Sequence, residues 1–153
     1  MLKERQGDAQ EAANRAAAYF GNGFHCAEAV AAAVLETLGQ DARQATAHAT
    51  AFGAGFARTF QEACGALSGG LIAIGHLYGR SEPGGDWDLP AELGEDLYTH
   101  FLHDHQTAHC ETLRRRFGEE AQMDECRKLV SATAAYLVRL LSEDGTGPES
   151  KNG

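Results

Sequence analysis

Residues 64–78 read CGALSGGLIAIGHLY, and this stretch decides the fold. Leucine and isoleucine alternate in it with glycine, alanine and serine, and we expect a helix from Cys64 to Tyr78. Each glycine inside a helix costs about 1 kcal/mol relative to alanine. The sequence must recover this cost through close contact with other helices or with a bound group. We therefore expect a glycine-rich helix at the centre of the core.

The rest of the chain also favours helices, because alanine is abundant and runs of β-branched residues are few. The spacing of apolar residues predicts further helices over residues 8–20, 24–38, about 42–52, from Pro90 through a stripe ending at Leu102, and 123–141. Glycines and prolines between residues 81 and 90 divide helices rather than domains. We expect an all-α fold, a single compact bundle of about five to six helices. Residues 1–143 would form one domain and residues 144–153 a disordered tail.

The charge of the chain argues against several kinds of partner. It carries 22 acidic and 13 basic residues, a net charge of -9, which would repel phosphate backbones and anionic lipid headgroups. No apolar run reaches the roughly 18 residues of a membrane span, and residues 1–11 lack the apolar core of a secretory signal. We expect a soluble, cytoplasmic protein that binds neither nucleic acid nor membrane.

Four dispersed cysteines, Cys26, Cys64, Cys110 and Cys126, are the main candidates for chemistry. Structural disulfides persist mainly in oxidising compartments, so redox chemistry or metal ligation is the more plausible role here. No pair has Cys-x-x-Cys spacing, so folding must assemble the site. Cys26 and Cys64 are expected at helix starts, where a thiolate is stabilised, which makes them candidate redox thiols. Alternatively, a buried free cysteine is a small hydrophobe, and Cys126 on its apolar stripe best fits that interpretation.

Residues around Cys64 are candidates for binding a cofactor. Gly53 and Gly55 permit close backbone approach, and amides of their loop could donate hydrogen bonds to sulfur if the loop folds next to Cys64. Gly65 directly follows Cys64, and we place it in the same group. Arg58 is either a cation that lowers the pKa of nearby thiols or an exposed loop residue.

A run of histidines precedes Cys110 and consists of His100, His103, His105 and His109. Their spacings of three and four could place pairs on shared helix faces, as a metal site requires. The other interpretation is a solvated helix end, where histidine suits the C-terminal dipole. His25 lies next to Cys26. It either tunes a neighbouring metal ligand or takes the place of one, or it has a capping or surface role.

Two blocks of this sequence and its last two cysteines resemble the C_GCAxxG_C_C family of redox-active proteins. The blocks are residues 25–30, HCAEAV, and residues 64–69, CGALSG, followed by Cys110 and Cys126. The resemblance extends over roughly residues 19–137, and four spaced cysteines with a glycine signature are far more specific than a lone glycine motif. It implies a helical redox protein in which all four cysteines have a function.

The chain departs from the family pattern at several positions. His25 stands where the family often has asparagine, Ala57 where glycine is common, and residues 114–116 form an arginine run. A related domain in split-Soret cytochromes is associated with an iron-sulfur centre. This chain has no Cys-x-x-Cys-His haem attachment motif, so any electron partner would be a separate protein.

Residues and resemblance together predict an electron-transfer or accessory redox protein rather than a stand-alone enzyme. Cys26, Cys64, Cys110 and Cys126 would converge to bind an iron-sulfur cluster. Two alternatives remain open at this point: thiol-disulfide chemistry with Cys64 or Cys26 as the reactive thiolate, and a structural module that holds zinc. The small residues of 64–78 also suggest a possible homodimer interface.

Overall fold

The structure is a computed structural model that describes residues 8–143. Within that range it contains seven α-helices, one short 3-10 helix (η1) and isolated bridges but no strand. The elements are α1 (Asp8–Tyr19), α2 (Cys26–Thr37), α3 (Arg43–Ala49), η1 (Thr50–Phe52), α4 (Gly65–Tyr78), α5 (Asp88–His105), α6 (Cys110–Phe117) and α7 (Gln122–Glu143). The all-α expectation is confirmed, whereas the expected five to six helices were too few. The predicted tail, residues 144–153, lies outside the described residues.

The helix missing from the prediction is α6, which begins at Cys110. Gln106 has a φ of 64°, a left-handed conformation that ends α5 at His105. His109 then caps a new helix, because its Nδ1 accepts a hydrogen bond from the Thr112 N–H at 3.3 Å. Histidine is not among the preferred N-cap residues, so the local sequence did not mark this start.

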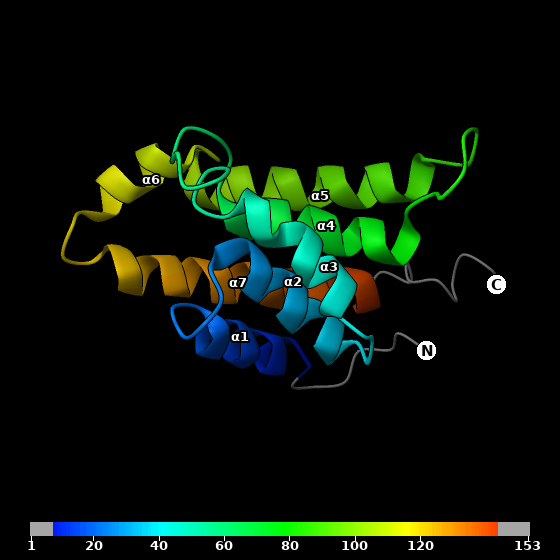
Figure 1. Ribbon diagram of the computed structural model, residues 1–153, viewed down its shortest axis with the longest axis horizontal. Coiled ribbons are helices and arrows are strands. Elements are labelled where there is room, and N and C mark those ends of the chain that lie inside the picture. The colour runs from blue at the N-terminus through cyan, green and yellow to red at the C-terminus, as the bar shows by residue number, and fades with distance from the viewer. Residues whose placement is uncertain (1–7, 144–153) are drawn as a thin grey trace.

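Helix α2 lies in the middle of the molecule and contacts α1, α3, α4 and α7 (Figure 1). Eight residues of α2 and eight of α4 are buried, and all seven helices contribute to one apolar cluster. The expected glycine-rich central helix is therefore present as α4, but the alanine-rich α2 shares the centre with it.

The glycines of α4 allow its neighbours to approach its backbone. A Cβ on Gly69 would lie 2.2 Å from the Ala27 carbonyl oxygen of α2, and one on Gly70 would lie 2.7 Å from Leu97 Cδ2 of α5. Close helix contact thus offsets the helix-propensity cost of these glycines. The small residues that suggested a subunit interface are used inside the chain, and the homodimer stays a prediction.

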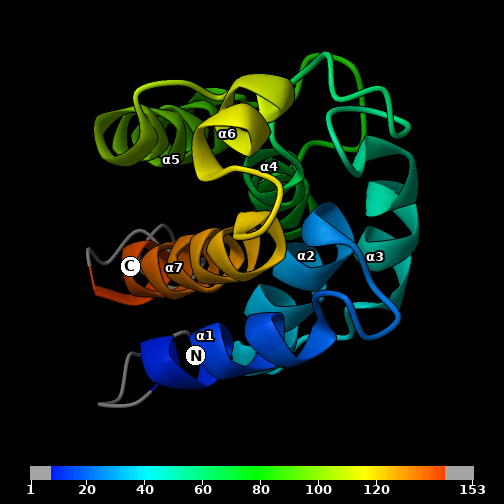
Figure 2. The ribbon, with the colours of Figure 1, turned by 90° about the vertical axis from the view of Figure 1, so that its left-hand side faces the viewer.

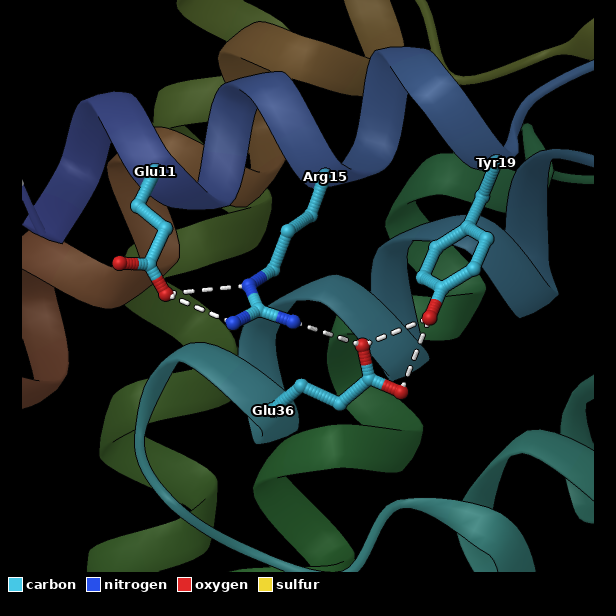
Figure 3. Close-up of polar contacts among 4 residues, drawn as sticks. All are labelled: Glu11, Arg15, Tyr19 and Glu36. Carbon is cyan, nitrogen blue, oxygen red and sulfur yellow. Dashed lines mark hydrogen bonds and ion pairs between the residues drawn. The ribbon is translucent and has the colours of Figure 1, made fainter.

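Polar contacts fix α1 on α2 (Figure 3). Glu36 accepts a hydrogen bond from the Tyr19 hydroxyl at 2.8 Å and pairs with Arg15 at 3.2 Å, while Arg15 also pairs with Glu11. The turn after α1 is closed by a hydrogen bond from the Gly21 N–H to the Phe24 carbonyl. These contacts set the position of the segment that leads into Cys26.

The first turns of α2, α4 and α7 lie at the same end of the molecule as α6, on the left in Figure 1. Figure 2 looks onto this end, where α6 lies over the start of α7 and the start of α2 lies beside the start of α7. No helix within residues 8–143 is both long and apolar enough to span a membrane. The arrangement brings four helix starts, each with a cysteine at or near it, to one place.

Candidate cysteine site

The four cysteines line one cavity of about 500 Å³. Cys26 and Cys110 are the first residues of α2 and α6, Cys64 is the N-cap of α4, and Cys126 lies one turn into α7. All four are free thiols. Most of the remaining lining is apolar and includes Phe20, Phe24, Leu113, Phe117, Met123 and Leu129. Residues spread over 100 positions of sequence thus meet in a largely apolar pocket.

A short antiparallel contact holds Cys64 beside Cys110. The Cys64 N–H donates to the Ala108 carbonyl at 2.6 Å, the Cys110 N–H donates to the Glu62 carbonyl at 3.0 Å, and Ala63 bridges His109. Backbone hydrogen bonds therefore fix both cysteines at the points where their helices begin. Nothing in the sequence near either cysteine indicates that residues 62–64 and 108–110 pair with each other.

Three glycines expected to bind a cofactor pack against the cysteines or against His25. A Cβ on Gly65 would lie 2.2 Å from Cys26 Sγ, and one on Gly53 would lie 2.5 Å from the His25 ring. Gly55 is left-handed, with φ +67°, and a Cβ there would lie 2.8 Å from the Cys110 Cβ. The glycines thus allow the elements that carry the site to approach one another, and their contact with a cofactor stays a prediction.

The loop between η1 and α4 has an unusual backbone. Ala54, Gly55, Phe56, Ala57 and Arg58 all have positive φ values, from 52° to 68°. A left-handed conformation costs about 1–2 kcal/mol for each non-glycine residue, so surrounding contacts must hold it. One such contact is the hydrogen bond from the Phe60 N–H to the Ala54 carbonyl at 2.9 Å. The loop therefore holds a strained backbone conformation next to the cysteine cavity, which Ala54 helps to line.

Cys26 is the cysteine whose surroundings favour the thiolate. Burial opposes its ionisation, but hydrogen bonds from the His25 side chain and the Ala54 amide outweigh burial and lower the pKa of Cys26. The same bond to Cys26 raises the pKa of His25, against the effect of burial. The interaction between His25 and Cys26 thus shifts both pKa values toward the charged forms of the two groups.

His25 also begins α2. Its Nδ1 accepts a hydrogen bond from the Glu28 N–H at 3.4 Å, its Nε2 donates to the Thr50 carbonyl at 2.8 Å, and the Glu28 side chain completes a capping box. The neutral ring can accept at Nδ1, whereas the protonated ring donates from both nitrogens. Capping and thiolate pairing therefore use different protonation states of one side chain.

The other three cysteines are held as thiols. Burial raises the pKa of Cys64, and the neighbouring Cys26 adds to this shift. Burial also raises the pKa of Cys110 to about 11 and that of Cys126 above its ordinary value. Cys26 and Cys64 were both expected as redox thiols on the strength of their helix starts, yet their pKa values move in opposite directions.

Sequence reasoning missed two side chains that act on the sulfurs. Arg114 lines the cavity, lies 4.2 Å from the centre of the Phe60 ring, and lowers the pKa values of Cys110 and Cys126 against the effect of burial. Gln122 Nε2 donates to Cys126 Sγ at 3.1 Å. Helical spacing gave a signal for both, since Arg114 and Gln122 lie four residues from Cys110 and Cys126. Arg58, the cation chosen from the sequence, is exposed and is not among the residues lining the cavity.

The histidine run takes separate roles in the structure. His100 stacks on Tyr136 with ring centres 3.6 Å apart, His103 contacts Asp104 at 3.3 Å, and His109 caps α6. His103 and His105 lie in the last turn of α5, as the helix-end interpretation expects. Between residues 8 and 143, no group of three or more His, Cys, Asp or Glu side chains is arranged around one point as for a single metal ion.

Alkaline pH should destabilise the reduced, metal-free protein. An unfolded cysteine ionises near pH 9, whereas Cys110 ionises near 11 in the folded protein, and Cys64 and Cys126 are also raised. Between these pH values the unfolded state binds fewer protons than the folded state, so the free energy of unfolding falls as the pH rises. Cys26, with its lowered pKa, acts in the opposite direction.

We expect urea denaturation under reducing conditions to give a free energy of unfolding that declines from about pH 9 to pH 11. The Cys110→Ala variant, which lacks one of the raised thiols, should show a smaller decline. A decline of equal size in both proteins would mean that Cys110 does not contribute.

Comparison with known proteins assigns the chain to a family. A family model described as "Putative redox-active protein (C_GCAxxG_C_C)" matches residues 24–140, which is more than half of the chain and contains all four cysteines. Searches of curated proteins and of solved structures gave no match. The matched range begins just before α2 and ends near the end of α7, so it includes every helix that contributes a cysteine to the cavity. The chain therefore belongs to the C_GCAxxG_C_C family.

Proposed function

We propose that the protein binds an iron-sulfur cluster through Cys26, Cys64, Cys110 and Cys126 and transfers electrons. The observation that carries the proposal is that these four cysteines, from four different helices, line a single cavity. Four cysteine thiolates are the usual ligand set of [2Fe–2S] and [4Fe–4S] clusters. When bound, such a cluster would supply one-electron transfer.

The electrostatics of the cavity support a negatively charged group of this kind. Cys26, Cys64 and Cys110 stand at the starts of α2, α4 and α6, where exposed amides and the helix dipole favour negative charge. Arg114 adds a cation to the same lining. These groups would offset the charge of several thiolates, against the opposing charge of the Glu28 carboxylate in the same lining.

The raised pKa values of three thiols are also compatible with ligation. Thiols that ionise reluctantly in the metal-free protein lose their protons when a metal binds, so cluster assembly would release protons. Gly65 leaves room for Cys26 Sγ against the α4 backbone, and Cys64 precedes that glycine directly. The fold would thus present two ligands side by side at the start of α4.

Anaerobic purification followed by iron, zinc and acid-labile sulfide assays tests the proposal. We expect iron and sulfide in stoichiometric amounts and a visible absorption band that bleaches on reduction. A colourless protein that lacks both iron and sulfide after reconstitution would reject it. Stoichiometric zinc would instead identify a metal-binding module of the structural kind.

Thiol-disulfide chemistry is a second candidate, and the lowered pKa of Cys26 favours it. Cys26 thiolate would attack a substrate disulfide and release one thiolate, and a second cysteine would then attack the Cys26 sulfur and release the second. The product is one disulfide in this chain and two thiols from the substrate. Alkylation with mass analysis distinguishes this function, because two thiols should be lost on mild oxidation.

The role in the cell also remains a proposal. An electron carrier or accessory protein, working with a separate redox partner protein in the cytoplasm, suits a small chain whose candidate chemistry lies in one thiol-lined cavity. The high net negative charge of -9 would disfavour polyanionic partners.

A further inference from the structure

Gln122 makes a side-chain contact with a candidate ligand. It is the first residue of α7, it is partly buried, and it lines the cysteine cavity. Its Nε2 donates a hydrogen bond to Cys126 Sγ at 3.1 Å. A hydrogen bond to a thiolate is charge-assisted and therefore stronger than one to a thiol. The contact gains strength as negative charge accumulates on sulfur.

We propose that Gln122 is a positioning residue that withdraws electron density from the Cys126 sulfur and raises the reduction potential of the centre that this sulfur helps to hold. The inference rests on the proposed function and deepens it. Hydrogen bonds to ligand sulfur raise cluster potentials because they stabilise the reduced, more negative state. Gln122 does this without being a ligand.

The other cysteines receive their hydrogen bonds differently. The Ala54 and Ala27 amides, together with His25, lower the pKa of Cys26, and the Ala66 amide acts in the same direction on Cys64 against the effect of burial. Backbone amides persist whatever side chain the position carries. Gln122 is a replaceable donor on the surface of the cavity, so it is a position at which a change of sequence sets the potential while the fold and ligands stay the same.

Two substitutions separate the hydrogen bond from the space that Gln122 fills. Gln122→Leu removes the donor and keeps a side chain of similar size. Gln122→Glu keeps the shape, removes the donor and places a negative charge beside the sulfur, and a carboxylate in the first turn favours the helix. Gln10→Leu is the matched control, because Gln10 is an exposed glutamine on α1 that bonds Asn14.

The first measurement is the reduction potential of the reconstituted protein. We expect the potential to fall in Gln122→Leu and to fall further in Gln122→Glu, each by up to about a tenfold change in the reduction equilibrium, which is 59 mV for a one-electron couple. Gln10→Leu should match the unmodified protein. A purely structural role would not place the two variants in this order, since glutamate fits the site at least as well as leucine.

The second measurement uses the reduced, metal-free protein. Iodoacetamide alkylation at pH 8, resolved by peptide mass spectrometry, should be slower by a few-fold at Cys126 in Gln122→Leu and slower again in Gln122→Glu, with Cys110 unchanged. Unaltered potential and unaltered alkylation in both variants would overturn the inference. If the unmodified protein takes up no iron or sulfide, the proposed function fails, and the alkylation rates alone decide whether Gln122 acts on Cys126.

Discussion

The Gly69→Ala variant is expected to lose about 3 kcal/mol of its free energy of unfolding, at the upper end of the range for overpacked cores. An alanine Cβ at this position would lie 2.2 Å from the Ala27 carbonyl oxygen and 2.9 Å from its carbonyl carbon. Both are backbone atoms of α2 and cannot turn aside as a flexible side chain would. The two central helices must therefore separate to admit one methyl group.

The matched control is Gly75→Ala in the same helix. A Cβ on Gly75 would meet nothing within 4 Å, and α4 is helical there. This variant should be more stable by about 0.5–1 kcal/mol because alanine is the better helix former. Urea denaturation of the two variants should thus give changes of opposite sign. Equal changes would mean that the α2–α4 contact does not require glycine at position 69.

The separation of α2 from α4 in Gly69→Ala should also change the geometry of the cysteine cavity. Gly69 lies one turn after Gly65, whose backbone packs against Cys26 Sγ. Pushing α4 away from α2 therefore moves Cys64 away from Cys26. Gly69→Ala should lower the amount of iron and sulfide retained per chain, whereas Gly75→Ala should leave that amount unchanged.

The Cys64→Ser variant is expected to retain at least about tenfold less iron and sulfide than the unmodified protein, since even partners of metal ligands affect affinity by 10–100-fold. Serine has nearly the same shape as cysteine and preserves the Cys64 N–H bond to Ala108, which is a backbone contact. Its hydroxyl remains protonated near neutral pH and is a poor ligand for iron. The loss would therefore reflect the missing thiolate and not a change in the helix start.

Circular dichroism and the urea midpoint of the metal-free protein provide the check on folding. Both should be close to those of the unmodified protein, because the pKa of Cys64 is raised and the group is a neutral thiol at pH 7. Ser68→Ala, one turn further along α4, is the matched control and should keep its iron and sulfide. Full retention of both by Cys64→Ser would show that Cys64 is not a ligand.

Local sequence patterns predicted most of the helices, with ends within a few residues of those in the structure. The helix expected over residues 64–78 is α4 (Gly65–Tyr78), and that expected over residues 24–38 is α2 (Cys26–Thr37). Apolar spacing and glycine stops are properties of neighbouring residues, so they can be read without the fold. Helix α6 was missed because its cap is His109 and because the left-handed Gln106 is not a residue that commonly breaks a helix.

The groups around the sulfurs were harder to predict, since their relation to the cysteines is spatial. Arg58 was interpreted either as a cation beside the thiols or as an exposed loop residue; it is exposed, and Arg114 is the arginine in the cavity lining. Gly53 and Gly55 were expected to bind a cofactor beside Cys64, and in the structure they face His25 and Cys110 instead. These contacts join residues that are far apart in the sequence, so they can be seen only once the packing of α4, α6 and the loop between η1 and α4 is known.

By itself the sequence determined that the chain is helical, that residues 64–78 form a central helix, and that four cysteines match the pattern of one family. It also placed Cys26 and Cys64 at helix starts, where their local settings look alike. Only the tertiary structure decided that they differ. Cys26 receives hydrogen bonds from His25 and from Ala54 of a distant loop, so its pKa falls, whereas burial dominates at Cys64 and its pKa rises. A helix start is a local property, but desolvation and hydrogen bonding at a sulfur depend on every element packed around it.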